Sequence, residues 1–318
     1  MYGLNELKKI IKVDSDAVEC PVKNCLSIVE RQRKVFKLES RFQCPIHKIF
    51  ISPSTFQYES KEDNLLWTDC EDINLLDKIF KVKRESRMAR DNSEDALTWN
   101  VFRFLDKQNL LTRFLSELSN KPIKEAELIL WSYSPEEKSG WSSLNTARTE
   151  FGETEARGSE PDIIILTDRV LYFIEAKLTA TNKTKPSNLS QRKKYEQGGS
   201  GLFHKIFKTD FVTIAIKNER YELMRFWILG NWIANQLKLD FEFYVLVLQS
   251  NESDLEAEFE KHIVKSSNSE FYRLTWEQIF NFIVQSGEAP EKQKMINYFQ
   301  NKTIGYDSDH HIIKAFNV

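Results

Sequence analysis

The chain has 318 residues, 41% of them hydrophobic, and a formal net charge of −2. Its length suffices for one large or two modest domains with a sizeable core, and its near-neutral balance gives no sign of nucleic-acid binding through overall charge. No uncharged apolar run is long enough to span a membrane, and the N-terminus lacks the apolar core of a signal peptide, so a soluble cytoplasmic protein is expected.

Residues 1 to about 60 hold three of the four cysteines. Cys20 and Cys25 form a C-x4-C pair, and Cys44 and His47 form a C-x2-H pair further along. In a reducing compartment such cysteines are more often metal ligands than disulfides, and four ligands of this kind suit tetrahedral Zn²⁺. The segment therefore looks like a small zinc ribbon in which a structural Zn²⁺ replaces a core. Free buried cysteines beside a surface histidine are the alternative.

Two strands are predicted within this zinc module, at residues 35–39 and 48–51. The module also carries basic side chains between its two ligand pairs. These side chains can touch DNA or form a solvated surface, and both interpretations stay open: Arg31, Arg33, Lys34, Lys37 and Arg41.

Residues 61–92 are charged and mixed, and 78–90 carry six basic residues against one acid. This stretch is interpreted as a linker helix or as an arm that contacts a nucleic-acid backbone. Asn92 or Ser93 is a good N-cap for a helix over 96–105. The acids that follow suit the dipole of the first helical turn.

A strand is predicted within 121–133, and the polar stretch 134–159 is interpreted as a long loop. The loop offers three acids that can approach a metal, and spacing does not choose among them: Glu150, Glu153 and Glu155.

Two short apolar runs follow and predict a β-hairpin. Asp162 begins the first run, and Glu175-Ala176-Lys177 ends the second. Alternation along a strand places Glu175 and Lys177 on one face and Ala176 on the other, and the hairpin brings Asp162 near that pair. Two carboxylates beside a lysine can hold a divalent cation and position a water for attack on a phosphodiester. A turn residue and a solvated cross-strand pair are the alternative.

Pro161-Asp162 followed by Glu175-x-Lys177 resembles the PD-(D/E)XK nuclease superfamily over roughly residues 93–250. The resemblance implies a restriction-endonuclease-like α/β fold with a mixed central sheet flanked by helices. It implies that Asp162, Glu175 and the carbonyl of Ala176 hold Mg²⁺ or Mn²⁺. It also implies that Lys177 orients or helps to deprotonate the attacking water.

Two further features extend the resemblance. By its position on the helix before the motif, Glu94 fits the glutamate that such nucleases often aim at the metal; a simple partner of the helix dipole is the alternative. Gln191 and Tyr195 stand one helical turn apart, similar to the Q-x3-Y motif of the RecB-like branch, where it supports the site and contacts nucleic acid. The basic residues between them are expected to contact the phosphate backbone: Arg192, Lys193 and Lys194.

The rest of the chain alternates helices and strands, as expected for an α/β sheet covered on both faces. The predicted elements are a buried helix at 221–237, a central strand at 241–248, a helix at 254–265, a short strand from 272 leading into a helix capped by Thr275, and a last helix at 291–300.

The sequence thus predicts a zinc-ribbon-like module (1–60), a linker or basic arm (61–92) and a nuclease-like domain (93–318). The expected function is a Mg²⁺-dependent endonuclease that hydrolyses phosphodiester bonds, with DNA as the preferred partner. A catalytically silent nucleic-acid-binding or scaffold protein that keeps the fold is the alternative, and a zinc-module transcription factor is weaker because no recognition helix stands out. Duplex, single-stranded, branched and RNA substrates all stay open, as does a homodimer.

Overall fold

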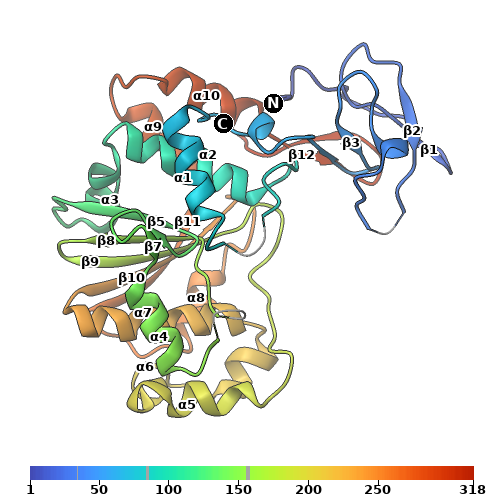
Figure 1. The fold of residues 1–318 in the computed structure, drawn as a ribbon. Coiled ribbons are helices and arrows are strands. Elements are labelled where there is room, and N and C mark those ends of the chain that lie inside the picture. The colour runs from blue at the N-terminus through green and yellow to red at the C-terminus, as the bar shows by residue number, and fades with distance from the viewer. Residues whose placement is uncertain (34, 84–85, 155–157) are drawn as a thin grey trace. The chain divides into compact units, whose positions relative to one another are not determined.

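Figure 1 shows the computed structural model, which describes residues 1–33, 35–83, 86–154 and 158–318. The chain divides into two compact units. The first comprises Met1–Asp69, Glu85–Gln108 and Trp276–Val318, and the second comprises Cys70–Arg84 and Asn109–Thr275. These units divide the chain at other positions than the predicted boundaries at residues 60 and 92. No helix of the described residues is long and apolar enough to cross a membrane.

The first unit contains short strand pairs and four-turn or shorter helices. Its strand pairs are antiparallel. Its elements are β1 (Ala17–Glu19) with β2 (Ile28–Glu30), β3 (Phe50–Ile51) with β4 (Phe56–Gln57), β12 (Thr303–Tyr306) with β13 (Ile312–Lys314), the 3-10 turns Ser40–Phe42 and Glu62–Asn64, and the helices α2 (Glu94–Lys107), α9 (Trp276–Gln285) and α10 (Lys292–Asn301).

The predicted helix over 96–105 is confirmed as the middle of α2. Ser93 is its N-cap, and the Ser93 hydroxyl accepts a hydrogen bond from the Ala96 amide at 3.1 Å. Every residue of 96–105 is buried. The strand predicted at 35–39 was wrong: these residues form no regular element, and Val35 is 70% exposed.

The second unit is built on a seven-stranded mixed sheet with the order β11-β10-β9-β8-β5-β6-β7. Strands β9, β10 and β11 are parallel, and the other neighbours are antiparallel. The strands are β5 (Ala126–Leu130), β6 (Tyr133–Ser134), β7 (Ser139–Gly140), β8 (Ile163–Thr167), β9 (Val170–Ala176), β10 (Asp240–Val247) and β11 (Ser269–Thr275). All seven residues of β9 are buried, as expected for a strand covered on both faces.

Helices cover both faces of this sheet (Figure 1). On one face Trp227 of α7 packs against Phe241, in a core that also includes Phe173. On the other face the Tyr172 hydroxyl lies 3.0 Å from the Ser119 hydroxyl of α3. The helices of the unit are α1 (Cys70–Ile79), α3 (Leu111–Ser119), α4 (Ser142–Glu150), α5 (Gln191–Gly201), α6 (Phe203–Ile206), the π-helix Thr213–Lys217, α7 (Tyr221–Leu237) and α8 (Leu255–Glu260).

Sequence and structure agree on the hairpin and on α7, whose bounds are those predicted. They differ at 134–159, which was predicted to be a loop but contains the end of β6, all of β7 and α4. They differ also at 254–265, where α8 ends at Glu260. The chain leaves the helix there because Ile263 forms a β-bridge with Phe207.

Candidate active site and metal centre

The hairpin places Asp162 and Glu175 at neighbouring strand ends. Strands β8 and β9 pair with Ile163 opposite Ile174, so one step further along the register Asp162 lies opposite Glu175. The Asp162 carboxylate accepts hydrogen bonds from the Ala176 amide at 3.0 Å and from the Trp131 indole at 3.2 Å. These two donors fix its orientation at the start of β8.

Lys177 lies beside Glu175 on the same face of the sheet. Its ammonium group contacts Glu175 Oε1, which agrees with the predicted alternation. It also lies 3.8 Å from a carboxylate oxygen of Glu222, in the first turn of α7. The Lys177 amide donates to the Leu246 carbonyl of β10 at 2.7 Å, which holds the chain against the sheet beyond the end of β9.

The environment of Glu175 disfavours a charged carboxylate. Burial raises the pKa of Glu175 well above its ordinary value, and the nearby charges of Asp162 and Glu222 raise it further, while Lys177 acts in the opposite direction. The Glu175 side chain is 5% exposed, and its Oε2 has no hydrogen-bond partner among the described residues. A buried acceptor without a donor beside a second carboxylate is the environment that a cation would relieve.

A buried network supports the entry to this site. Glu153 accepts hydrogen bonds from the amide and the hydroxyl of Ser159, from the Tyr195 hydroxyl and from Arg225. Burial alone would raise the pKa of Glu153, but the charge of Arg225 and these hydrogen bonds lower it below the ordinary value. Arg148 donates to the Ser159 carbonyl at 2.8 Å. The backbone three residues before Asp162 is therefore held from both sides.

The predicted Gln191–Tyr195 helix is α5, and its residues have different environments. Tyr195 is fully buried, so its ring is not available to a ligand. Its hydroxyl donates a hydrogen bond to Glu153 in the network that holds Ser159. Gln191 is half-buried, and Arg192 and Lys193 are exposed. Lys194 is half-buried, with its ammonium group 5.0 Å from the centre of the Tyr195 ring. Contact of these side chains with nucleic acid stays a prediction.

The other predicted acids lie elsewhere. Glu94 is the first residue of α2 in the first unit, and its role at a metal stays a prediction. Glu150 accepts a hydrogen bond from the Gly199 amide at 3.2 Å, and Glu155 lies outside the described residues. Sequence reasoning missed Glu222, because an acid at a helix start so far from the motif reads as a partner of the helix dipole.

Cys20, Cys25, Cys44 and His47 come together in the first unit, with their ligand atoms all within 4.8 Å of one another. The Cys25 and Cys44 sulfurs are 3.8 Å apart, and His47 Nδ1 lies 3.6 Å from the sulfurs of both Cys20 and Cys44. Metal–sulfur and metal–nitrogen bonds of zinc length predict tetrahedral edges of about 3.8 Å and about 3.6 Å. The cluster therefore has the size of a tetrahedral zinc site.

Backbone turns present these ligands. The His47 amide donates to the Cys44 sulfur at 3.5 Å, and the chain leaves this turn through Lys48, which has a left-handed φ of 57°. Asn24 has a similar φ of 60° just before Cys25. The three cysteines are buried, so the four residues could bind a metal such as zinc.

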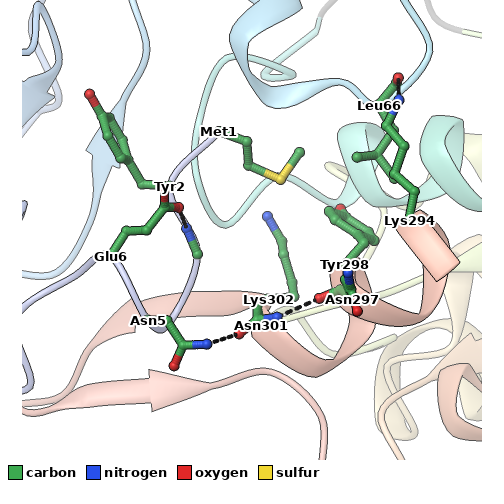
Figure 2. A pocket seen from close by; sticks show the side chains of 11 residues that line it. Met1, Tyr2, Asn5, Glu6, Leu66, Lys294, Asn297, Tyr298, Asn301 and Lys302 are labelled. Carbon is green, nitrogen blue, oxygen red and sulfur yellow. Dashed lines mark hydrogen bonds between the residues drawn. The ribbon is translucent and has the colours of Figure 1, made fainter.

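A pocket of about 530 Å³ also lies in the first unit (Figure 2). Several of its polar side chains already have partners: Asn5 donates to Asn301 at 2.8 Å, and Lys294 donates to a carbonyl oxygen (Figure 2). The ammonium group of Lys302 likewise donates to a carbonyl oxygen. The polar groups named here already have partners, so they provide no argument for a particular ligand.

No family model matches this chain, and neither a curated protein nor a solved structure matches it. The fold and the site define an α/β protein with a helix-flanked mixed sheet and a buried cluster of three cysteines and one histidine.

Proposed function

We propose that this protein is a metal-dependent nuclease of the PD-(D/E)XK type, with a restriction-endonuclease-like second unit. One observation carries the proposal: Asp162 and Glu175 stand at adjacent strand ends of one sheet, with Lys177 in contact with Glu175. The mixed sheet with helices on both faces supports the same interpretation.

Mg²⁺ fits the residues at this strand end. The buried Glu175 Oε2 lacks a hydrogen-bond partner among the described residues, and Asp162 lies close enough to raise the pKa of Glu175. Asp162, Glu175 and the carbonyl of Ala176 would hold the cation. When bound, Mg²⁺ or Mn²⁺ supplies charge stabilisation on the phosphate and lowers the pKa of a water.

The chain's own residues do the positioning. Asp162 is oriented by the Ala176 amide and the Trp131 indole, so its carboxylate is ordered before a cation arrives. Lys177 holds a positive charge beside Glu175 and would orient the attacking water and steady the phosphate charge. Glu222 places a second carboxylate 3.8 Å from the ammonium group of the lysine.

The zinc cluster has a separate, structural role in this proposal. A Zn²⁺ held by Cys20, Cys25, Cys44 and His47 would fill all four positions of a tetrahedron and leave none for a substrate. Closed sites of this kind contribute folding energy to small modules.

A cleavage panel tests the function. Plasmid, linear duplex, single-stranded DNA and RNA are incubated with the protein in Mg²⁺ and then in Mn²⁺, beside Asp162→Ala and Lys177→Ala. We expect the unaltered protein alone to cleave at least one substrate, and both variants to fold normally by circular dichroism. Full cleavage by Lys177→Ala would remove the lysine from the mechanism. An unaltered protein that binds a substrate but never cleaves it would identify the silent binding protein instead.

A further inference from the structure

A hollow of about 830 Å³ opens on the first unit and is lined by the zinc module and by residues just before α2. Arg31, Arg33 and Arg90 line it, together with Phe36 and a group of serine, threonine and amide side chains. None of the described residues that line it is acidic. We call it the arginine hollow.

Little opposes the positive charge of its arginines. Arg31 donates to a backbone carbonyl at 2.9 Å, and this neutral acceptor does not cancel the positive charge of the guanidinium group. Arg33 pairs with Asp16 at 2.6 Å, but the two side chains are 69% and 80% exposed, and such pairs contribute little. Water and salt screen an exposed pair of this kind, so a phosphate can compete for the guanidinium group.

Arg90 lies deeper and has no carboxylate partner among the described residues. Burial lowers the pKa of Arg90, and the neighbouring charge of Arg87 lowers it further. Its guanidinium group lies 5.0 Å from the centre of the Phe36 ring and donates to Gln57 at 3.4 Å. The hollow therefore contains a partly buried cation that a ligand's negative charge would stabilise.

The pairing of Arg90 with Phe36 adds a stacking surface to this charge. An aromatic ring with a guanidinium plane on it offers a flat surface for a nucleobase, and the surrounding arginines suit phosphates. Single strands present both groups at once, because their bases are not paired. A duplex buries the base faces that Phe36 would need.

We propose that the arginine hollow binds a single-stranded segment of nucleic acid, with phosphates on the three guanidinium groups and a base against Phe36. The proposal deepens the proposed nuclease function and rests on it for the choice of nucleic acid as the ligand. In this proposal the zinc module binds substrate in addition to its structural role.

Fluorescence anisotropy tests the charge. The zinc-loaded full-length protein, without added Mg²⁺, is titrated into a labelled single-stranded oligonucleotide and into the same sequence as a duplex. We expect Arg31→Ala with Arg33→Ala to raise the Kd for the single strand about tenfold at moderate salt. The plot of log K against log salt should become shallower by about 1.4, since each lost phosphate contact on a single strand removes about 0.7.

The matched control removes the same charge elsewhere. Arg41 and Arg113 are exposed, lie outside the hollow, and pair with Glu39 and Glu117. The double variant of Arg41→Ala with Arg113→Ala should leave the Kd within about twofold of the unaltered protein. Equal weakening by both double variants would overturn the proposal, because the hollow would then be no better than any basic surface.

The proposed contact between a base and Phe36 is tested by a separate variant. Phe36→Ala should weaken single-strand binding and leave the salt slope unchanged, with an unaltered melting temperature as the check on folding. Displacement of the oligonucleotide by millimolar inorganic phosphate would assign the hollow to a small anion, and tighter binding of the duplex would also overturn the proposal.

Cleavage is measured separately, so the two proposals can fail separately. Loss of binding in the hollow variants of a protein that cleaves nothing would keep the hollow and reject the nuclease. Unchanged binding by the hollow variants of a protein that cleaves would reject the hollow and keep the nuclease.

Discussion

Four charged side chains are concentrated at the end of β9: Asp162, Glu175, Lys177 and Glu222. Three of them are acids, so the lysine alone does not balance them. The cluster therefore opposes ionisation of all three acids at once, as the raised pKa of Glu175 shows. Asp162 and Glu175 are paired across strands, whereas Glu222 comes from the helix that covers the same face.

Glu222 and Glu94 are rival candidates for a third carboxylate at the proposed Mg²⁺ site, beside Asp162 and Glu175. Variants of the two residues decide between them. Glu222→Gln should lower cleavage by about 10- to 100-fold and raise the Mg²⁺ concentration for half-maximal rate, because Lys177 loses its second carboxylate. Glu94→Gln should leave both values near those of the unaltered protein. The opposite pattern would return the role to Glu94, the acid predicted from the sequence.

Glu153 predicts a pH dependence of stability. Its pKa is lowered in the folded state, so its stabilisation is present above the ordinary glutamate pKa and is lost as the pH falls through the lowered value. Glu153→Gln should therefore cost about 3 kcal/mol at pH 7, because Arg225 is left without its buried partner.

Denaturant titrations of both proteins at neutral and acidic pH measure this difference. The gap between the unaltered protein and Glu153→Gln should close as the pH falls through the lowered pKa of Glu153, where the carboxyl of the unaltered protein becomes protonated. A gap that stays constant with pH would show that the ion pair is not its source.

At the scale of elements, α7 approaches β10 closely at one position. Gly230 lies in the middle of the helix, and a Cβ there would come within 2.0 Å of the Phe241 ring. Alanine usually stabilises a helix interior by about 1 kcal/mol relative to glycine. Here the close approach reverses that sign, because the added methyl group has no space.

Gly230→Ala should therefore destabilise the protein by about 1–3 kcal/mol, measured from the denaturant midpoint. Phe241→Leu provides the matched test, since a smaller side chain leaves room for the methyl group. The cost of Gly230→Ala should shrink in the Phe241→Leu background. A stabilising Gly230→Ala in the parent protein would contradict the packing described here.

The elements that the sequence predicts well have strong local patterns. Helix α7 shows a long periodic apolar stretch, and the β8–β9 hairpin shows two apolar runs around a turn. Helix α4 was missed because only three of its nine residues are buried and its polar residues resemble those of a loop. Glu153 was seen only as one of three acids, since its partners Tyr195 and Arg225 come from α5 and α7 and no local pattern shows them.

For the whole molecule, the two candidate metal sites belong to different units and should respond separately. Asp162→Ala should keep one zinc per chain, measured by elemental analysis, and should lose Mg²⁺-dependent cleavage. Cys44→Ser should bind no zinc and should lower the melting temperature of the first unit, because a metal held by the cluster would support folding of the module. Loss of zinc from Asp162→Ala would show that the sites are coupled.

The first unit is made of three separate stretches of chain, which has a consequence for synthesis. Tyr306 packs in the core that contains the cysteines, and its hydroxyl donates to the Lys8 carbonyl at 2.9 Å. Leu4 donates to the Asn301 carbonyl at 2.8 Å. During synthesis the three cysteines and His47 therefore leave the ribosome before the C-terminal stretch does. Their core is completed only when that stretch, with Tyr306, has been made. The seven-stranded sheet, complete by Thr275, can form during that wait.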